Sequence, residues 1–455
     1  MLERHPKPAP ARPLVVAVEM GYGHLRAAAP LADALGTEVV QVDRAPLVAP
    51  DEERLWSRLR RSYEAVSRLS QLPAVGTPLR WVLDSITDIP RLHPYRDLSA
   101  PTGSVRTLER LARRGLGEGL VRRLRETGAP LLTTFFSSAI AADRAGCDRI
   151  FCVVTDTDIS RVWAPMDPAR TRIRYLVPTR RAARRLRSYG VPEAQITFTG
   201  FPLPDGLVGG PSLSVLKRHL AARIVRLDPS GEFRRSMPEE LAHFLGALPR
   251  GEERSPPRIV FAIGGAGAQA GIAAASLPGF RPALEAGALR VSLVAGVRRD
   301  VDARFREAIH RARMEPLLGG PLEILAAPTF AEYYARFNDL LSRTDVLWTK
   351  PSELVFYGAL GIPLVLSPPV GVHERYNRRW ARESGAGLKQ REARFAAERI
   401  SDWLADGVLA AAAWAGYMRL PKFGLFRILE AVCGPEAAAA AGEPSQPLAP
   451  GSTRR

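Results

Sequence analysis

The sequence predicts an α/β protein with two Rossmann-like domains that face each other across a central cleft. Short, continuous apolar runs alternate with helical patterns, which is typical of parallel sheets covered by helices on both faces. Two such series follow one another, and a stretch rich in proline, glycine and charge separates them at 204–257. The length of 455 residues is sufficient for two or three domains.

The expected strands define the domain boundaries. The first series has apolar runs at 14–18, 38–42, 131–136, 150–154 and 196–202. The second series has them at 258–264, 289–296, 322–328, 345–350 and 362–368. We therefore expect an N-terminal domain at 13–203, a linker or helical insert at 204–257 and a C-terminal domain at 258–432. The ends, 1–12 and 433–455, are expected to be disordered, and a helix near 423–432 is expected to cross back to the first domain.

The amino-acid composition indicates the charge of the expected binding partner. Lysine and arginine number 64 against 47 acidic residues, a net charge of +17 that favours an anionic partner. The alternative is a general preference for arginine without functional meaning. The three cysteines form no pattern typical of disulfides or zinc. The N-terminus does not resemble a signal peptide, and no run of about 18 apolar residues occurs, so a cytoplasmic protein is expected.

Polar residues follow the first and fourth expected strands, at the edge where open α/β sheets bind ligands. Gly21, Gly23 and His24 follow the first strand. His24 can take a proton from a bound hydroxyl, or it can simply cap a helix. Asp156 and Asp158 follow the fourth strand and resemble the metal-binding D-x-D of single-domain glycosyltransferases. A turn-capping aspartate is the alternative there.

The second series opens with a glycine-rich loop, GGAGAQAG at 264–271, whose amides suit a phosphate. Its spacing is not that of a dinucleotide-binding loop, and no acidic residue ends the next strand, so an NAD site is not expected. Neither a P-loop nor the G-x-S-x-G of hydrolases occurs. Arg298 and Arg299 follow the next strand and either face a diphosphate or lie in solvent.

Residues 349–387, TKPSELVFYGALGIPLVLSPPVGVHERYNRRWARESGAG, resemble the donor-binding segment of GT-B glycosyltransferases. The relatives are the monogalactosyldiacylglycerol synthases, the processive diacylglycerol glucosyltransferases and the peptidoglycan N-acetylglucosaminyltransferase. Stretches at 20–28, 153–163 and 175–203 also resemble this family, in its order. The residues of 349–387 that match its pattern are Thr349, Lys350, Pro351, Leu354, Ala359, Leu360, Pro363, Glu374, Asn377, Gly385 and Gly387.

The resemblance implies a GT-B fold and transfer of a sugar from a nucleotide sugar, expected to be a UDP-sugar, to an acceptor hydroxyl. It implies an inverting reaction without metal or cofactor, a lipid as one class of acceptor, and no nucleic-acid partner. His24 would be the catalytic base near the acceptor loop of Gly21 and Gly23, with Asp156 as the second catalytic candidate. The donor site would comprise Gly265, Gly267, Arg298, Phe330, Lys350, Ser352, Glu353, Glu374 and Asn377.

The chain departs from the family pattern at the donor segment. Gly358 replaces a glutamate that contacts the donor ribose in the family, and Ser352 and Glu353 replace two glycines. His373 replaces a glutamine in a segment that is one residue longer. These departures keep two alternatives open: a degenerate, non-catalytic protein that binds nucleotide sugars or lipids, and a sugar-nucleotide epimerase of the same fold.

A basic, aromatic helical pattern spans 52–92 and includes Trp56 and Trp81. Related lipid glycosyltransferases dock on membranes through this region, and such helices suit an anionic interface. We therefore expect peripheral attachment to the inner face of the membrane. The alternative is a helix that faces the core and leaves its basic side in solvent.

Overall fold

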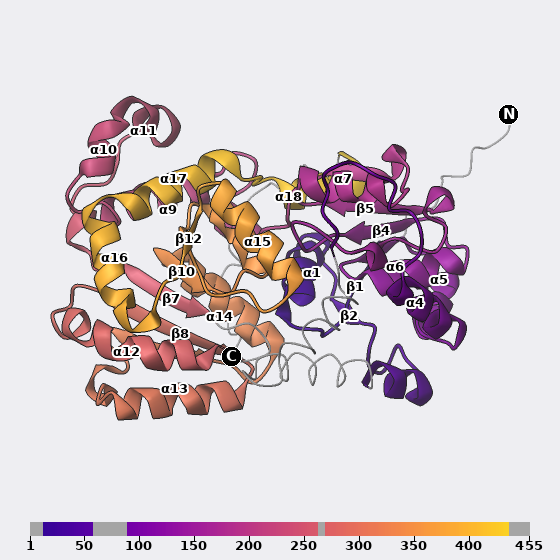
Figure 1. The fold of residues 1–455 in the computed structure, drawn as a ribbon, viewed down its shortest axis with the longest axis horizontal. Coiled ribbons are helices and arrows are strands. Elements are labelled where there is room, and N and C mark those ends of the chain that lie inside the picture. Colours follow the sequence, from indigo (N-terminus) through magenta and orange to yellow (C-terminus); the bar gives the residue numbers. More distant parts are fainter. Residues whose placement is uncertain (1–11, 58–88, 263–268, 436–455) are drawn as a thin grey trace, which may run out of the picture.

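The computed structural model describes residues 12–57, 89–262 and 269–435. Two parallel sheets, each flanked by helices, form two domains that lie side by side (Figure 1). The predicted fold class is therefore confirmed.

The first sheet has six strands in the order β2-β1-β3-β4-β5-β6, and every neighbouring pair is parallel. Its strands are β1 (Leu14–Ala17), β2 (Val40–Gln41), β3 (Leu131–Thr133), β4 (Ile150–Val153), β5 (Ile173–Val177) and β6 (Ile196–Phe198). The α-helices of this domain that lie wholly within the described residues are α1 (Tyr22–Leu35), α4 (Gly103–Arg113), α5 (Glu118–Thr127), α6 (Phe136–Arg144) and α7 (Arg180–Ser188).

The second sheet also has six parallel strands, in the order β12-β11-β10-β7-β8-β9. Its strands are β7 (Arg258–Ala262), β8 (Arg290–Gly296), β9 (Leu322–Ala326), β10 (Val346–Thr349), β11 (Leu364–Leu366) and β12 (Gly387–Lys389). The helices around it include α12 (Ala270–Glu285), α13 (Arg299–Arg311), α14 (Phe330–Ser342), the 3₁₀ helix η6 (Glu353–Leu360), α15 (Val372–Glu383), α16 (Ala396–Ala405) and α17 (Val408–Arg419).

Burial explains the continuous apolar runs. Every residue of β4 and of β7 is buried, because helices cover both faces of each sheet. The ten expected strands are confirmed to within a few residues. The structure adds β5 and β12, which were not among them.

The segment 204–257, expected as a linker or helical insert, contains α8 (Asp205–Val208), α9 (Ser214–Arg226), α10 (Glu232–Ser236) and α11 (Pro238–Leu245). Helix α9 buries Leu216, Leu220 and Ile224 in the core of the second domain. The buried Arg223 side chain donates hydrogen bonds to the carbonyls of Thr344, Leu360 and Gly361. Helix α9 is therefore an integral part of the second domain.

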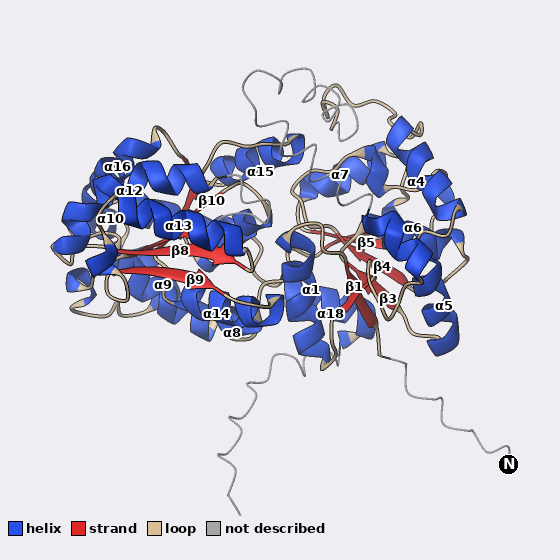
Figure 2. Ribbon diagram, turned by 90° about the horizontal axis from the view of Figure 1, so that it is seen from below, coloured by secondary structure: helices blue, strands red, loops and turns tan. Residues whose placement is uncertain are grey.

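Helix α18 (Gly424–Cys433) returns to the first domain, as the sequence predicts, and lies beside α1 (Figure 2). Leu425, Ile428 and Leu429 pack in one buried cluster with side chains of β1, α1, β3, β4 and β5. A β-carbon at Gly424 would stand 2.0 Å from the Phe201 carbonyl oxygen, so the close approach requires glycine.

Little of the expected membrane-docking segment at 52–92 can be followed. Its described residues include Trp56, which is buried in the first core and donates to the Glu52 carboxylate at 3.2 Å. Residues 58–88, which include Trp81, lie outside the described residues, and the description resumes at Ile89. Of the helices that the structure describes, none is long and apolar enough to cross a bilayer. The ends that were expected to be disordered lie almost wholly outside the described ranges.

Candidate functional site

The carboxyl ends of the two sheets face each other. In the first sheet the strand order reverses between β1 and β3, and in the second between β10 and β7. Such reversal points open the crevice where doubly wound sheets bind ligands. The loops that leave these strands meet at the junction of the domains, where direct hydrogen bonds join them.

Two glycines shape the loop after β1. Gly21 precedes α1 with a φ of 92°, a conformation that side chains other than glycine rarely adopt. At Gly23 a β-carbon would stand 3.0 Å from the Glu353 Oε2 atom of the other domain. Gly23 therefore leaves room for a carboxylate of the second domain. Their predicted role as an acceptor loop stays a prediction.

His24 lies at the reversal point of the first sheet. Its Nδ1 is 2.7 Å from the carbonyl oxygen of Thr134, the first residue after β3. A carbonyl only accepts, so Nδ1 carries the proton and Nε2 keeps its lone pair. Burial lowers the pKa of the ring, while the charge of Asp156 opposes that shift. The ring is therefore neutral at pH 7, and Nε2 is its hydrogen-bond acceptor.

Asp156 and Asn377 join the two domains. Asn377, buried on α15, donates from Nδ2 to Asp156 Oδ1 at 2.9 Å. Its Oδ1 accepts from the Thr157 amide at 2.9 Å and from the Thr157 hydroxyl at 2.8 Å. These bonds bring together two residues for which the sequence predicted different roles: Asp156 in catalysis and Asn377 in binding the donor.

Asp158 has a different environment from Asp156. It is fully buried and accepts from Arg185 at 2.8 and 3.0 Å and from Arg181 at 2.8 Å. Its carboxylate thus anchors α7 to the loop after β4. Throughout the described ranges, no group of three or more His, Cys, Asp or Glu side chains is placed to hold a metal ion.

Lys350 and Glu374 form an ion pair just beyond β10, with Nζ 2.9 Å from Oε1. The other oxygen of Glu374 accepts from the Val370 amide at 2.8 Å. Burial by itself would raise the pKa of the Glu374 carboxyl, but Lys350, His373 and the Val370 amide outweigh it and hold the pKa below its usual value. An ion pair of ammonium and carboxylate therefore lies next to the reversal point of the second sheet.

Arg26 and Glu353 form a buried ion pair across the domains. Arg26 also donates to the Tyr333 hydroxyl, and its guanidinium lies 5.3 Å from the Tyr22 and Tyr333 ring centroids and 5.0 Å from that of Phe337. Burial would raise the pKa of Glu353, yet the charges of Arg26 and Lys350 hold it below its usual value. The residue that replaces a family glycine is thus an ionised interdomain contact.

The other predicted donor residues have different environments. Gly265 and Gly267 lie outside the described residues. Arg298 is bound to Asp300 at 2.8 and 2.9 Å. Phe330 begins α14 with its ring centroid 5.9 Å from that of Tyr22, and Ser352 is buried directly ahead of Glu353.

Gly358 has a packing role. A β-carbon there would stand 3.1 to 3.3 Å from Leu420, Ala386 and Leu364. Its carbonyl is so close to Gly416 of α17 that a β-carbon on Gly416 would come within 2.3 Å. A glutamate side chain at 358 would therefore require Leu420, Ala386 and Leu364 to move away.

The sequence predicted no role for Arg26, Tyr22, Tyr333 or Thr134. One signal was available for the first, because Arg26 interrupts an otherwise apolar, alanine-rich stretch of α1, and all residues from Leu25 to Ala32 are buried. A buried arginine requires a partner, and Glu353 is a charge that the family pattern does not explain.

No protein-family model matches the chain, and no curated protein matches it. Solved structures similar to it include a MnaA–UDP co-structure from S. aureus, which is 12% identical, with 91% of this chain and 94% of that chain covered and a TM-score of 0.48. MurG from Acinetobacter baumannii is 12% identical, with 92% and 98% covered and a TM-score of 0.45. A UDP-GlcNAc 2-epimerase from Neisseria meningitidis bound to UDP-GlcNAc is 11% identical, with 93% and 96% covered and a TM-score of 0.44.

These three TM-scores lie below 0.5, so the fold is assigned from the chain's own topology. Two Rossmann-like domains with facing carboxyl ends, and a C-terminal helix that returns to the first domain, make up the GT-B architecture.

Proposed function

We propose that this chain transfers a sugar from a UDP-sugar to an acceptor hydroxyl, with inversion and without a metal or cofactor. The observation that carries the proposal is His24, a neutral imidazole at the reversal point of the first sheet with Nδ1 bound to a carbonyl and Nε2 available. The choice of UDP and of a lipid among the acceptors rests on the family resemblance.

His24 would act as the general base. Its Nε2 takes the proton of the acceptor hydroxyl as the hydroxyl oxygen forms a bond to the anomeric carbon. The bond from that carbon to the diphosphate oxygen breaks on the opposite side, which inverts the configuration. The proton ends on His24 and the electron pair on the departing nucleotide diphosphate. Base catalysis of this kind contributes about 10²–10⁴-fold.

The second domain would hold the donor. Lys350 follows β10 beside the reversal point, and Arg298 precedes α13. Together with the amides at Gly265 and Gly267, they would neutralise a diphosphate whose charge grows in the transition state. Glu374 and Asn377, in the N-terminal half of α15, would lie nearer the sugar. We propose a cytoplasmic location with peripheral membrane attachment for the same enzyme.

A second candidate is a degenerate protein that binds nucleotide sugars without transferring them. The Arg26–Glu353 pair favours it, because a buried carboxylate occupies the loop after β10, where the family has glycine. An anionic side chain there would oppose a diphosphate unless the pair opened or faced away from it.

The test combines binding and turnover. Calorimetry with UDP, with and without EDTA, should give binding that does not depend on metal. Incubation with a panel of UDP-sugars and a lipid extract should then release UDP. Binding without release in any mixture would favour the degenerate protein. A rearranged UDP-sugar formed without acceptor would identify an epimerase, and failure to bind UDP would reject all three.

A further inference from the structure

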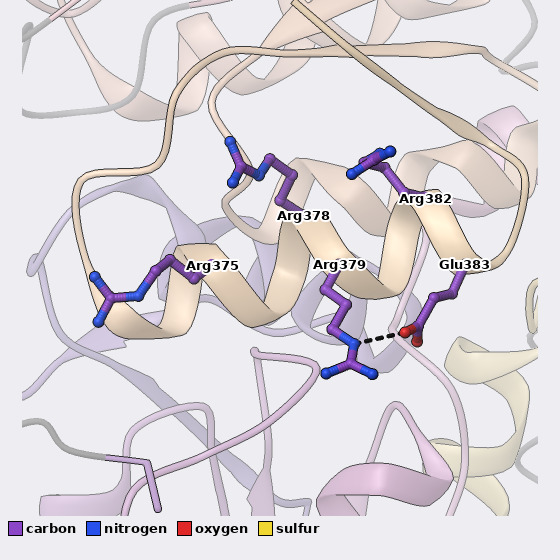
Figure 3. A pocket seen from close by; sticks show the side chains of 5 residues that line it. All are labelled: Arg375, Arg378, Arg379, Arg382 and Glu383. Carbon is purple, nitrogen blue, oxygen red and sulfur yellow. Dashed lines mark hydrogen bonds and ion pairs between the residues drawn. The ribbon is translucent and has the colours of Figure 1, made fainter. Parts of the chain in front are cut away.

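Helix α15 carries four arginines that line one open pocket of about 320 Å³, together with Glu383 (Figure 3). Arg378 and Arg382 project from one side of the helix, and Arg379 projects from the other side toward Glu383, whose carboxylate it contacts at 2.5 Å. Of the four arginines, Arg375 lies nearest the N-terminal end of the helix. The buried side of the helix, with Glu374 and Asn377, belongs to the candidate site described above.

The charges on this helix repel one another. Arg378 and Arg382 are four residues apart, a spacing at which like charges destabilise a helix. Partial burial, followed by the charge of Arg382, lowers the pKa of Arg378. Within the described ranges, neither Arg378 nor Arg382 forms an ion pair with a carboxylate. The helix therefore retains an unfavourable charge arrangement that a bound anion would relieve.

The positive surface continues past the end of α15. A second pocket, of about 380 Å³, shares Arg382 with the first and adds Lys389, Arg391 and Arg399. Neither Asp nor Glu is among the residues that line it. Arginine forks bind the oxygens of a phosphate in pairs, whereas a lysine contributes a single point charge. Three cationic side chains thus extend a surface that is centred on the arginines of α15.

We propose that the side of α15 that carries Arg378 and Arg382 is a binding site for a phosphate group, carried by an anionic phospholipid headgroup or by a free phosphate compound. A single-stranded nucleic acid is disfavoured, because surfaces that bind single strands combine positive charge with aromatic rings on which the bases stack. Trp403 is the one aromatic side chain lining the two pockets, and the Arg399 guanidinium lies 5.8 Å from its ring centroid. The site lies on the second domain and does not depend on the transferase proposal.

The test uses a charge-matched pair of double variants of the full chain. Arg378→Gln with Arg382→Gln removes two charges from the site. Arg106→Gln with Arg110→Gln removes two exposed charges at the same spacing from α4 of the first domain. Binding is measured at physiological salt to phosphatidylcholine vesicles with and without phosphatidylglycerol, and to inorganic pyrophosphate by calorimetry. Thermal melting checks the fold, and loss of mutual repulsion predicts that both variants remain folded.

The site variant should weaken binding by about 10- to 100-fold, while the α4 variant stays close to the wild type. Loss confined to vesicles with phosphatidylglycerol identifies a headgroup as the source, and loss of pyrophosphate binding alone identifies a free phosphate compound. Equal losses in both variants would mean that only net charge matters and would overturn the proposal. The absence of binding to both the vesicles and pyrophosphate would also overturn it. Binding to single-stranded RNA is measured in parallel, and a loss seen with RNA alone would overturn the proposal as well.

Discussion

At the scale of single residues, the Thr134 carbonyl fixes what His24 can do. The hydrogen bond to Nδ1 orients the ring and leaves Nε2 as the acceptor. If this nitrogen takes the acceptor's proton, His24→Ala should lower kcat by roughly two to four decades. Affinity for UDP should stay nearly unchanged, because the proposed donor residues lie on the other domain. Calorimetry and UDP release measure the two effects separately.

The matched control is His243→Ala, since His243 is exposed on α11 of the second domain. It should retain full turnover. If His24→Ala also retains it, His24 only stabilises its loop, and Asp156 becomes the next candidate for the base.

The pH profile of the reaction gives an independent reading of the same side chain. Burial is the largest influence on the ring and lowers the pKa of His24 from its ordinary value. A base works only when it is unprotonated, so turnover should be full above about pH 6.5 and fall as the pH drops through the lowered pKa. The residual rate of His24→Ala should lack this acidic limb. A limb that persists in the variant would assign the pH dependence to another group.

Glu353 and Arg26 should be strongly coupled in stability. Removing one partner of a buried pair leaves the other charge unpaired, so Glu353→Ala should cost about 3–5 kcal/mol in urea unfolding. Arg26→Met combined with Glu353→Ala should cost less than the sum of the single changes. The pKa of Glu353 is depressed, so its contribution is present above the unfolded-state pKa and is lost as the pH falls through the folded-state value. Additive losses would show that the two side chains are not coupled.

The sequence could place candidate residues at strand ends but could not pair them. His24, Asp156 and Lys350 follow apolar runs, and strand ends are where ligands bind. The contact of Arg26 with Glu353 spans 327 positions, and that of Asn377 with Asp156 spans 221. Neither pair has a local signature, because each depends on how the two domains meet.

At the scale of elements, Asp158 should affect the docking of α7 rather than any metal. Its carboxylate is fully buried between Arg181 and Arg185 of that helix. Asp158→Asn keeps the size but removes the charge, and should lower stability by about 3–5 kcal/mol. Activity of the folded variant should respond to EDTA and Mn²⁺ as the wild type does. An altered response to Mn²⁺ would restore the D-x-D interpretation.

Elements that the sequence analysis overlooked have patterns weaker than a continuous apolar run. β5 includes the exposed Arg174, which breaks its apolar stretch, and β12 has only three residues. Helix α9 reads SVLKRHLAARIVR, so its buried leucines are mixed with charges, one of which, Arg223, is itself buried. The sequence predicted a linker or helical insert at 204–257, but the mixture of leucine and charge in this helix did not show that its apolar stripe packs on the second core.

At the scale of the whole molecule, two kinds of contact join the domains. Near the candidate site, polar contacts accompany the packing of the Tyr22 ring on Phe330 and Tyr333. The polar contacts are Asn377 with Thr157, Arg26 with Glu353, and the Tyr22 hydroxyl accepting from the Val297 amide at 3.0 Å. Away from it, α18 makes an apolar contact with the first domain. Hydrogen bonds between the domains can be replaced by hydrogen bonds to a polar substrate. The apolar side chains of α18 cannot be compensated by such a substrate in the same way. We therefore expect α18 to hold the domains together while the polar contacts change.

Truncation tests this anchor. A chain that ends at Phe423 loses Leu425, Ile428 and Leu429, which are at most 2% exposed. Burial of each such side chain is worth about 1.5–3 kcal/mol, so the loss is roughly 5–9 kcal/mol, comparable to the whole stability of a typical domain. The first domain should then unfold at a much lower urea concentration, which fluorescence of its tryptophans can follow. A chain that ends at Gly434 keeps α18 and should unfold like the full chain. If the shorter chain unfolds at the same urea concentration, α18 does not stabilise the first domain.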